Sequence, residues 1–420
     1  MKERSMIKKQ LFIASLLCFS QGIQALVPLN LIRPFNPNFF PVHEHDEKLQ
    51  ILGLVSTGFA THGQATNSYP TNVLQTLYPL QDSLSMLKGF PALSQQAQLG
   101  QQINIDDQSG VRGLFRATGD FYVPFMGSLT AFGYLYKGVW LGAFLPLISM
   151  KMNNVQWEDL TQNLTLDDAL THQLLTNNLA TNVALLGDGL SIGNWQKTGV
   201  GDLAFFAGWR QGFYQDKRWL KEVRVNIRLG LICPTGVKKN EDIAVSLPFG
   251  NDGAFSIPFA AGLDLRFRTF FWAGVDVTFM QIFNNTRVRR IQTDTSQTNL
   301  LLLQKTNARR DYGLTQMYNL YFEPIIYKGL SFRAAYENIK HGQDKLYILS
   351  NNFSSNVANG AVGLQEWTTH DFFLQLKLDT GYNRNDARYK PQCMVFVKLP
   401  FNGKRSLQVS LVGFELTCSF

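Results

Sequence analysis

Charged residues are scarce in this chain of 420 residues, because Asp, Glu, Lys and Arg together make up only 17% of it. A typical soluble domain has about 25%. A chain so poor in charge would ordinarily be strongly apolar, yet the mean hydropathy is −0.08. Near-neutral hydropathy beside 13% aromatic residues is typical of transmembrane β-barrels, in which apolar lipid-facing side chains alternate with polar lumen-facing ones.

Long apolar runs are also lacking. No segment beyond the N-terminus approaches the ~20 consecutive apolar residues of a membrane-spanning helix. The run LFIASLLCF follows a cluster of lysines and an arginine and precedes the small residue Ala25. This order predicts an export signal peptide over residues 1–25. Residues 26–48, rich in Pro, Phe and Asn, are expected to form a periplasmic segment or a small plug.

Cysteine is rare, and the three that follow residue 25 are Cys233, Cys393 and Cys418. An odd, sparse set at apolar strand positions predicts small hydrophobic side chains rather than a disulfide framework. The chain has a formal net charge of +8, but no basic helix or aromatic-basic platform accompanies it. A nucleic-acid partner is therefore not expected.

Histidine is equally sparse, with six residues in the chain. The segment His43-Glu44-His45-Asp46 contains metal-ligating types, but two histidines one residue apart in a flexible segment are more often solvated. His370 has no neighbouring serine that would suggest a hydrolytic Ser–His pair. We therefore expect no metal, no cofactor and no enzymatic activity.

Period-two alternation is what the sequence has in abundance. In KEVRVNIRLGLIC (221–233) one face is apolar, and the other carries Glu222, Arg224, Asn226 and Arg228. The final stretch GFELTCSF alternates in the same way and ends on Phe420. Such alternation predicts strands with one oily and one wet face. An edge strand of a soluble sandwich would explain eight residues alone, but not the same pattern along the whole chain.

The alternating runs predict an all-β chain, an antiparallel up-and-down barrel of about 12 strands over residues 49–420, with 14 as the alternative. Short periplasmic turns and long extracellular loops separate the strands, with a tight hairpin turn at Asn402-Gly403. The location expected is the bacterial outer membrane. The expected strands are 49–60, 117–136, 138–151, 199–214, 221–234, 253–268, 270–284, 310–327, 330–345, 366–381, 391–401 and 405–420.

Tryptophans are predicted to mark the two membrane interfaces, because none falls in the middle of an expected strand. Phe420 would join the periplasmic ring of aromatics and resembles, in part, the terminal signal read by the barrel-assembly machinery. Two helices are expected in the loops. One is an amphipathic helix beginning at Thr165, and the other is a short helix closed by Gly89.

One hairpin has a more distinctive order. The stretch TGVGDLAFFAGWRQGFYQDKRWLKEVRVNIRLGLICPTG (198–236) opens on Gly-Asp, turns on a short charged segment and ends on Pro-Thr-Gly. A weaker echo lies at 117–146. This hairpin resembles the repeating unit of the long-chain fatty-acid transporter and aromatic-degradation porin superfamily. The resemblance implies an outer-membrane channel. Those relatives have more strands and a longer N-terminal hatch.

Charged residues on the inward face are the candidate functional residues. They form either a ladder that favours anions or ion pairs that fill a narrow barrel. The predicted lumen set is Arg210, Arg224, Arg228, Asp264, Arg266, Arg268, Asp276, Glu323, Arg333, Glu337 and Lys377. A basic mouth is predicted at the extracellular side, where it could bind lipopolysaccharide phosphates, from Arg287, Arg289, Arg290, Arg309 and Arg310.

These features predict an outer-membrane channel or passive transporter for small solutes, either anion-leaning or of the hydrophobic-substrate type. The alternative is a structural or surface-attachment barrel with a closed lumen. An outer-membrane enzyme ranks below both. The expected partners are outer-membrane lipid and lipopolysaccharide, the barrel-assembly machinery and a small solute.

Overall fold

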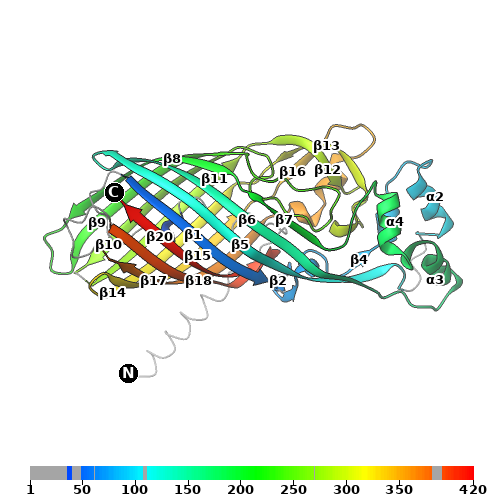
Figure 1. Cartoon of the computed structure of the whole chain (residues 1–420). Coiled ribbons are helices and arrows are strands. Elements are labelled where there is room, and N and C mark those ends of the chain that lie inside the picture. The colour runs from blue at the N-terminus through cyan, green and yellow to red at the C-terminus, as the bar shows by residue number, and fades with distance from the viewer. Residues whose placement is uncertain (1–35, 40–48, 61, 107–110, 269, 381–389) are drawn as a thin grey trace, which may run out of the picture.

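Strands form a closed barrel in the computed structural model, which describes residues 36–39, 49–60, 62–106, 111–268, 270–380 and 390–420 (Figure 1). Twelve antiparallel strands pair with their neighbours, and the first and last pair with each other. They are β1 (Leu49–Ala60), β5 (Leu114–Tyr136), β6 (Val139–Asp159), β8 (Leu203–Tyr214), β9 (Leu220–Cys233), β10 (Ser256–Phe267), β11 (Phe271–Ile282), β14 (Thr315–Tyr327), β15 (Leu330–His341), β17 (Trp367–Asp379), β18 (Lys390–Lys404) and β20 (Ser410–Ser419). The fold class and strand count predicted from the sequence are confirmed.

Closure of the barrel depends on the antiparallel register of β1 and β20, which runs from Gln50 opposite Ser419 to Phe59 opposite Ser410. The amide of Phe420 also donates a hydrogen bond of 2.9 Å to the carbonyl oxygen of Leu49. Closing the sheet leaves no edge strand, so every backbone group in the membrane can find a partner.

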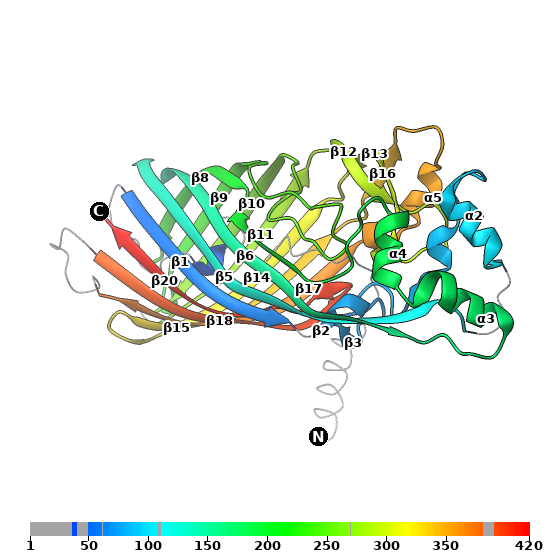
Figure 2. The ribbon, with the colours of Figure 1, turned by 45° about the vertical axis from the view of Figure 1, so that its right-hand side comes forward.

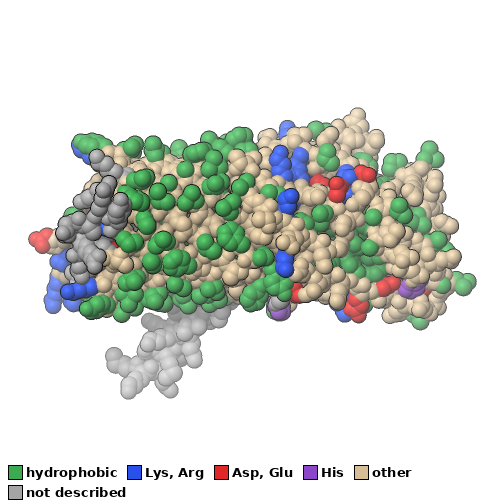
Figure 3. All heavy atoms as spheres, viewed as in Figure 1, with side chains coloured by type: hydrophobic (Ala, Val, Ile, Leu, Met, Phe, Trp, Pro, Cys, Tyr) green, Lys and Arg blue, Asp and Glu red, His purple; other side chains and the backbone are tan. Residues whose placement is uncertain are grey.

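The alternation in sequence becomes the two faces of the barrel wall. In β14, Tyr318, Leu320 and Phe322 point outward and are exposed, whereas Asn319 and Glu323 point inward and are buried. Apolar side chains cover the outside of the barrel as a broad band (Figure 3). A charged side chain facing lipid would be costly, so the charges in the middle of the strands lie on the inner face, and outward ones such as Lys221 and Lys340 lie near strand ends. No helix among the described residues has the length and apolar character needed to cross a membrane.

Tryptophan marks the interfaces less than the sequence predicts. Trp140, Trp195, Trp272 and Trp367 are buried rather than exposed at a membrane interface, whereas Trp219 is exposed at the short-turn end. The distance of a residue from the end of its strand gives its height in the membrane. Whether its side chain faces lipid or the lumen depends instead on its place in the apolar–polar alternation of the strand. Exposed aromatics do lie at the short-turn end, and they are mostly Tyr and Phe: Tyr136, Phe213, Tyr214, Trp219, Phe270, Tyr327 and Phe420.

The long loops form a compact assembly at the opposite end. β5 and β6 continue past the barrel and carry the loop helices at their tips (Figure 2). Two short strands, β4 (Gln81–Asp82) and β7 (Trp195–Val200), extend this ribbon. Two three-stranded sheets lie in the loops: β12 (Asn285–Ile291), β13 (Gln304–Asp311) and β16 (Lys345–Ile348), and β19 (Ser406–Leu407), β2 (His62–Gln64) and β3 (Pro70–Asn72).

Two loop helices occur where the sequence predicts them. The capping box expected at Thr165 is present, with the Thr165 side chain accepting from the amide of Asp168. The helix is interrupted by a π turn, so its parts are α3 (Leu166–Thr171), η4 (His172–Thr176) and α4 (Leu179–Leu186). The segment before Gly89 forms a 3-10 turn, η3 (Ser85–Leu87). The remaining helices are η1 (Pro37–Phe39), η2 (Val73–Gln75), α2 (Gln95–Gln102), η5 (Asn299–Leu301), α5 (Ser355–Asn359) and η6 (Val362–Leu364).

The turn predicted at Asn402-Gly403 is not there. β18 runs through both residues to Lys404, and the chain reverses afterwards at Arg405, whose φ is 51°. The β17–β18 register shifts between His370 and Asp371. The pairing of β19 with β2 holds the reversal outside the barrel wall. Pairing of β19 with β2, which are distant in the sequence, therefore places the turn at Arg405 rather than at the Asn402-Gly403 motif.

Candidate functional site

Ion pairs fill the lumen beside β9, β10 and β11. Arg228 binds Asp276 through two hydrogen bonds of 2.7 Å each, the bidentate geometry that is strongest for a guanidinium and a carboxylate. Arg224 donates to Glu222 at 2.9 Å, and Arg266 lies 3.7 Å from the other oxygen of Glu222. All four of Arg224, Arg228, Glu222 and Asp276 are buried. Each of these arginines therefore lies beside a carboxylate, and Arg224 and Arg266 share Glu222.

A second charged cluster crosses β14, β15 and β17. Glu323 is fully buried and accepts hydrogen bonds from Arg333 and, at 2.7 Å, from the Ser331 hydroxyl. Lys377 lies 3.6 Å from Glu323. Tyr321 donates to Asp264 at 2.6 Å, and this carboxylate is also 3.9 Å from Arg210. The positive charges on this side are matched by carboxylates as well.

The N-terminal segment reaches into the same lumen. The side-chain amide of Asn36 donates to Glu337 at 3.1 Å, and the Arg333 guanidinium donates to the Pro37 carbonyl oxygen at 2.7 Å. Asn38 is fully buried. The rest of the 26–48 segment lies outside the described residues. The described part thus lies among lumen side chains that are distant in the sequence: Asn36 and Glu337 are 301 residues apart.

Polar groups without a protein partner also point into the lumen. The side-chain amides of Gln50, Asn319 and Gln375 are buried, and neither the oxygen nor the nitrogen of any of them finds a hydrogen-bond partner among the described residues. A buried amide without a partner costs free energy, and native proteins satisfy such groups with water or a bound molecule. The lumen therefore presents polar groups, besides the ion pairs, to which water or a solute can hydrogen-bond.

Ten of the eleven residues predicted for the lumen face the interior, and Arg268 does not. Its backbone forms the short turn after β10, with φ of 48°, and its guanidinium lies 3.7 Å from the centre of the Trp219 ring at the barrel end. The strand was predicted to run one residue too far, through Arg268. The interior also has charged residues outside that set: Glu222, Asp371, Asp379, Lys398 and Glu415.

The predicted basic mouth is folded into the loop assembly. Arg287 and Arg289 both bind Asp252, at 2.8 Å in the case of Arg289. Arg290 donates to the carbonyl oxygens of Gly187 and Leu303, each at 2.7 Å. These arginines join loops rather than form an open surface, because a buried guanidinium needs several acceptors at once.

The last two arginines differ in exposure. Arg310 binds Asp344, whereas the Arg309 side chain is 44% exposed and lies over the Tyr347 ring. Burial alone would raise the pKa of Asp344. Arg310 and the hydrogen bonds from His341 and the Gly313 amide outweigh burial and lower this pKa to about 2. The carboxylate is therefore charged at neutral pH and holds β13 to the end of β15.

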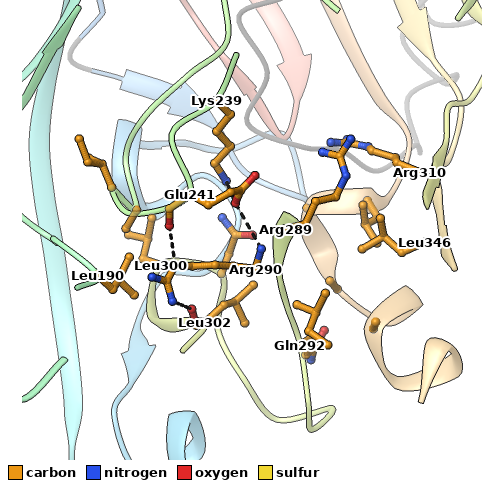
Figure 4. Close-up of a pocket in the computed structure, with 18 residues that line it drawn as sticks. Leu190, Lys239, Glu241, Arg289, Arg290, Gln292, Leu300, Leu302, Arg310 and Leu346 are labelled. Atoms are coloured by element: carbon orange, nitrogen blue, oxygen red, sulfur yellow. Dashed lines mark hydrogen bonds and ion pairs between the residues drawn. The ribbon is translucent and has the colours of Figure 1, made fainter. Parts of the chain in front are cut away.

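Two neighbouring cavities lie inside the loop assembly, of about 100 and 110 Å³. Figure 4 shows the residues that line the first. Both are lined by Lys239, Ala244, Asn299, Leu300 and Arg310. Apolar side chains form part of the remaining wall: Leu190, Ile243, Ile291, Leu302, Leu346 and Leu364 around the first cavity, and Leu74, Leu77, Met152, Val245, Leu247 and Pro248 around the second. Polar and charged side chains form the rest, from Glu241, Arg289, Arg290 and Gln292 in the first cavity and Ser246, Asn251, Asp252 and Tyr312 in the second.

Among the cations that line these cavities, Lys239 has the longest ion-pair distance to a carboxylate. Its ammonium is 4.0 Å from Glu241, and its side chain is 37% exposed. The acid itself is held elsewhere, because Glu241 also binds Arg287. Sequence reasoning did not single out Lys239. The adjacent lysines in VKKNED carry no spacing signal, and the apolar wall comes from loops far apart in the sequence.

The fold and the lumen define the class of protein: a twelve-stranded β-barrel of the bacterial outer membrane, with the fold of its channels. No protein-family model matches the chain, and no curated protein matches it. Among solved structures, the COG4313 outer membrane channel from Pseudomonas putida F1 has a similar fold. It matches at a TM-score of 0.51 and 11% identity, over 93% of this chain and 100% of that one.

Other solved structures match at TM-scores below 0.5. A FadL homologue from Pseudomonas aeruginosa matches at a TM-score of 0.32 and 9% identity, over 89% of this chain and 90% of that one. The toluene transporter TodX from Pseudomonas putida matches at 0.30 and 12%, over 95% of each chain. At such identities the likeness concerns the fold.

Proposed function

We propose that the chain is a passive outer-membrane channel for small solutes that have an apolar body and a polar or anionic head. The loop cavities are its outer binding site. The observation that carries the proposal is the shared wall of the two cavities, which combines Leu300 and Ala244 with the loosely paired ammonium of Lys239. A mostly apolar pocket with few polar groups is the usual form of a small-molecule site.

Selection of anions by a ladder of arginines is not part of this proposal. Arg224, Arg228 and Arg333 each have a carboxylate at hydrogen-bond distance, so their fields largely cancel along the path. The preference of the channel would then arise at the loop cavities, where binding of the apolar body comes first. Polar lumen side chains would pass the head group toward the other end.

The N-terminal segment is assigned a role in the same proposal, as a small plug. Asn36 and Pro37 tie it to Glu337 and Arg333 at contact distances of 3.1 and 2.7 Å. The two hydrogen bonds of these described residues can be broken at modest cost, because each contributes about 1 kcal/mol net. Removal of residues 26–48 should therefore raise the conductance without unfolding the barrel.

The experiment measures uptake of benzoate, benzyl alcohol and glucose into vesicles that contain the refolded full chain. Benzoate and benzyl alcohol should enter faster than glucose. Ala244→Phe, which fills both cavities, should slow both aromatic solutes, and Lys239→Gln should slow benzoate more than benzyl alcohol. Ala180→Phe is the matched control, because Ala180 is exposed on α4 outside the cavities. Equal uptake by wild type and Ala244→Phe would contradict the proposal.

One observation favours a second function, a closed barrel that serves structure or surface attachment. The lumen charges are extensively paired, and Arg228 and Asp276 are both deeply buried, as expected of an interior filled for stability. Planar-bilayer recording separates the two functions. Stepwise openings by the folded protein support the channel, and a folded barrel that conducts in neither its full-length form nor the form lacking residues 26–48 supports the closed barrel.

A further inference from the structure

Unpaired basic residues gather at the short-turn end of the barrel. Every one of the first four short turns carries at least one Lys or Arg, whereas Asp216 is the one acid among their described residues. Many cations of the lumen and loops have carboxylate partners, Arg228, Arg289 and Arg333 among them, whereas the short-turn cations have no ion pair among the described residues. The set is Lys137, Lys217, Arg218, Arg268 and Lys328 in the turns, with Lys221 on the outer face of β9.

Two of these cations occupy backbone positions that do not suit them. Lys137 has φ of 46° and Arg268 has φ of 48°, in the left-handed region where glycine and asparagine are less strained. A long basic side chain at such a position gains nothing locally from its backbone. We therefore ascribe the presence of Lys137 and Arg268 to the positive charge that they place at the barrel end.

Trp219 organises the densest part of the set. The Arg268 guanidinium lies 3.7 Å from the centre of its ring and the Arg218 guanidinium 5.8 Å from it. The amide of Arg268 also donates to the Trp219 carbonyl oxygen at 2.7 Å. The β8–β9 and β10–β11 turns are adjacent because β9 pairs with β10. Stacking occupies the faces of the guanidinium groups and leaves their N–H edges free to donate.

The position of this cluster along the barrel axis places it at the level of the lipid headgroups. Trp219 is 56% exposed, and Phe213 and Phe270, which flank the two turns, are also exposed. The outer apolar band extends to this end of the barrel (Figure 3). An indole prefers the interface between hydrocarbon and water, which is where headgroup phosphates lie. Lys221 faces outward one residue into β9, so its ammonium can extend to the same level.

We propose that Arg218, Trp219 and Arg268 form a binding site for an anionic phospholipid of the leaflet at the short-turn end. The phosphate oxygens accept hydrogen bonds from both guanidinium groups, in the geometry that favours Arg over Lys at phosphates. The indole contacts the glycerol and the first part of the acyl chains. Lys137 and Lys328 extend the attraction to neighbouring headgroups around the barrel.

The test is native mass spectrometry of the refolded full chain, released from vesicles that contain equal amounts of phosphatidylglycerol and phosphatidylcholine. Phosphatidylglycerol should be retained about tenfold more than phosphatidylcholine, since two arginines near the membrane surface act on one headgroup. The double variant Arg218→Gln, Arg268→Asn should lose this preference. Asparagine suits the positive φ at position 268, so the variant keeps the turn.

Lys137→Asn is the matched control, because it removes a charge from the same type of backbone position in another turn. It should reduce the preference less than twofold. Equal retention of the two lipids, or an unchanged preference in the double variant, overturns the proposal. Full displacement of the lipid by inorganic phosphate would also overturn it, because the site would then be a general anion site rather than a lipid site.

A second measurement applies if the double variant fails to fold. Brominated phosphatidylglycerol should quench part of the tryptophan fluorescence of the wild-type barrel, and Trp219→Phe should remove most of that quenching. Brominated phosphatidylcholine should quench less. Equal quenching by the two lipids, or quenching that persists in Trp219→Phe, contradicts the site.

Discussion

Replacing Glu323 with glutamine tests how strongly the charged interior stabilises the barrel. Glu323 is fully buried, and its carboxylate holds Arg333 and Lys377. The neutral amide can still accept from the Ser331 hydroxyl through its oxygen, but it would leave the two buried cations without their shared counter-ion and would turn an N–H donor toward them. Removing one partner of a buried ion pair costs about 3–5 kcal/mol. We therefore expect the free energy of unfolding of Glu323→Gln to fall by about 3 kcal/mol or more.

The assay is urea unfolding of the refolded barrel in lipid vesicles, followed by tryptophan fluorescence. Glu158→Gln is the matched control, because Glu158 makes a 2.9 Å ion pair with Arg116 in which both side chains are about half exposed. An exposed pair of this kind contributes about 0.2–1 kcal/mol. A cost for Glu323→Gln no larger than that of Glu158→Gln would refute the reasoning and would mean that lumen water screens the cluster.

Three further predictions concern the loops and the wall. The pKa of Asp344 near 2 lies below its ordinary value of 3.8, so its interactions with Arg310, His341 and the Gly313 amide together contribute about 2 kcal/mol above pH 4. This contribution is lost as pH falls through 2; protease cleavage of the loops should rise over that interval in wild type and be already high in Asp344→Asn at neutral pH. Thr165→Ala removes the cap of α3, costs about 1 kcal/mol locally and should speed cleavage there while the urea midpoint of the barrel stays unchanged. Gly208→Val should lower the unfolding free energy by about 1–3 kcal/mol, because a Cβ at this position would lie 2.4 Å from the Trp140 ring; an unchanged urea midpoint would show that the ring moves freely.

The sequence by itself determined the barrel. Period-two alternation decides which side chains face lipid and which face the interior, because successive Cβ atoms point to opposite faces of a strand. That is why the strand count and the inward positions of Arg224 and Glu323 could be predicted. The capping box at Thr165 was predictable for a similar reason, since it depends on residues three apart.

Only the tertiary structure decided which side chains form ion pairs and hydrogen bonds across loops and strands. Asp252 holds Arg287 and Arg289, and Asn36 meets Glu337, although no local pattern links these residues. The reversal at Arg405 instead of Asn402-Gly403 and the inward-facing tryptophans have the same origin. The intrinsic preference of a turn or strand residue contributes about 1 kcal/mol. Strand register and burial outweigh it, because a shift in register changes the environment of every residue in the strand. The loop cavities and the site at Trp219 likewise exist only where distant turns and loops come together.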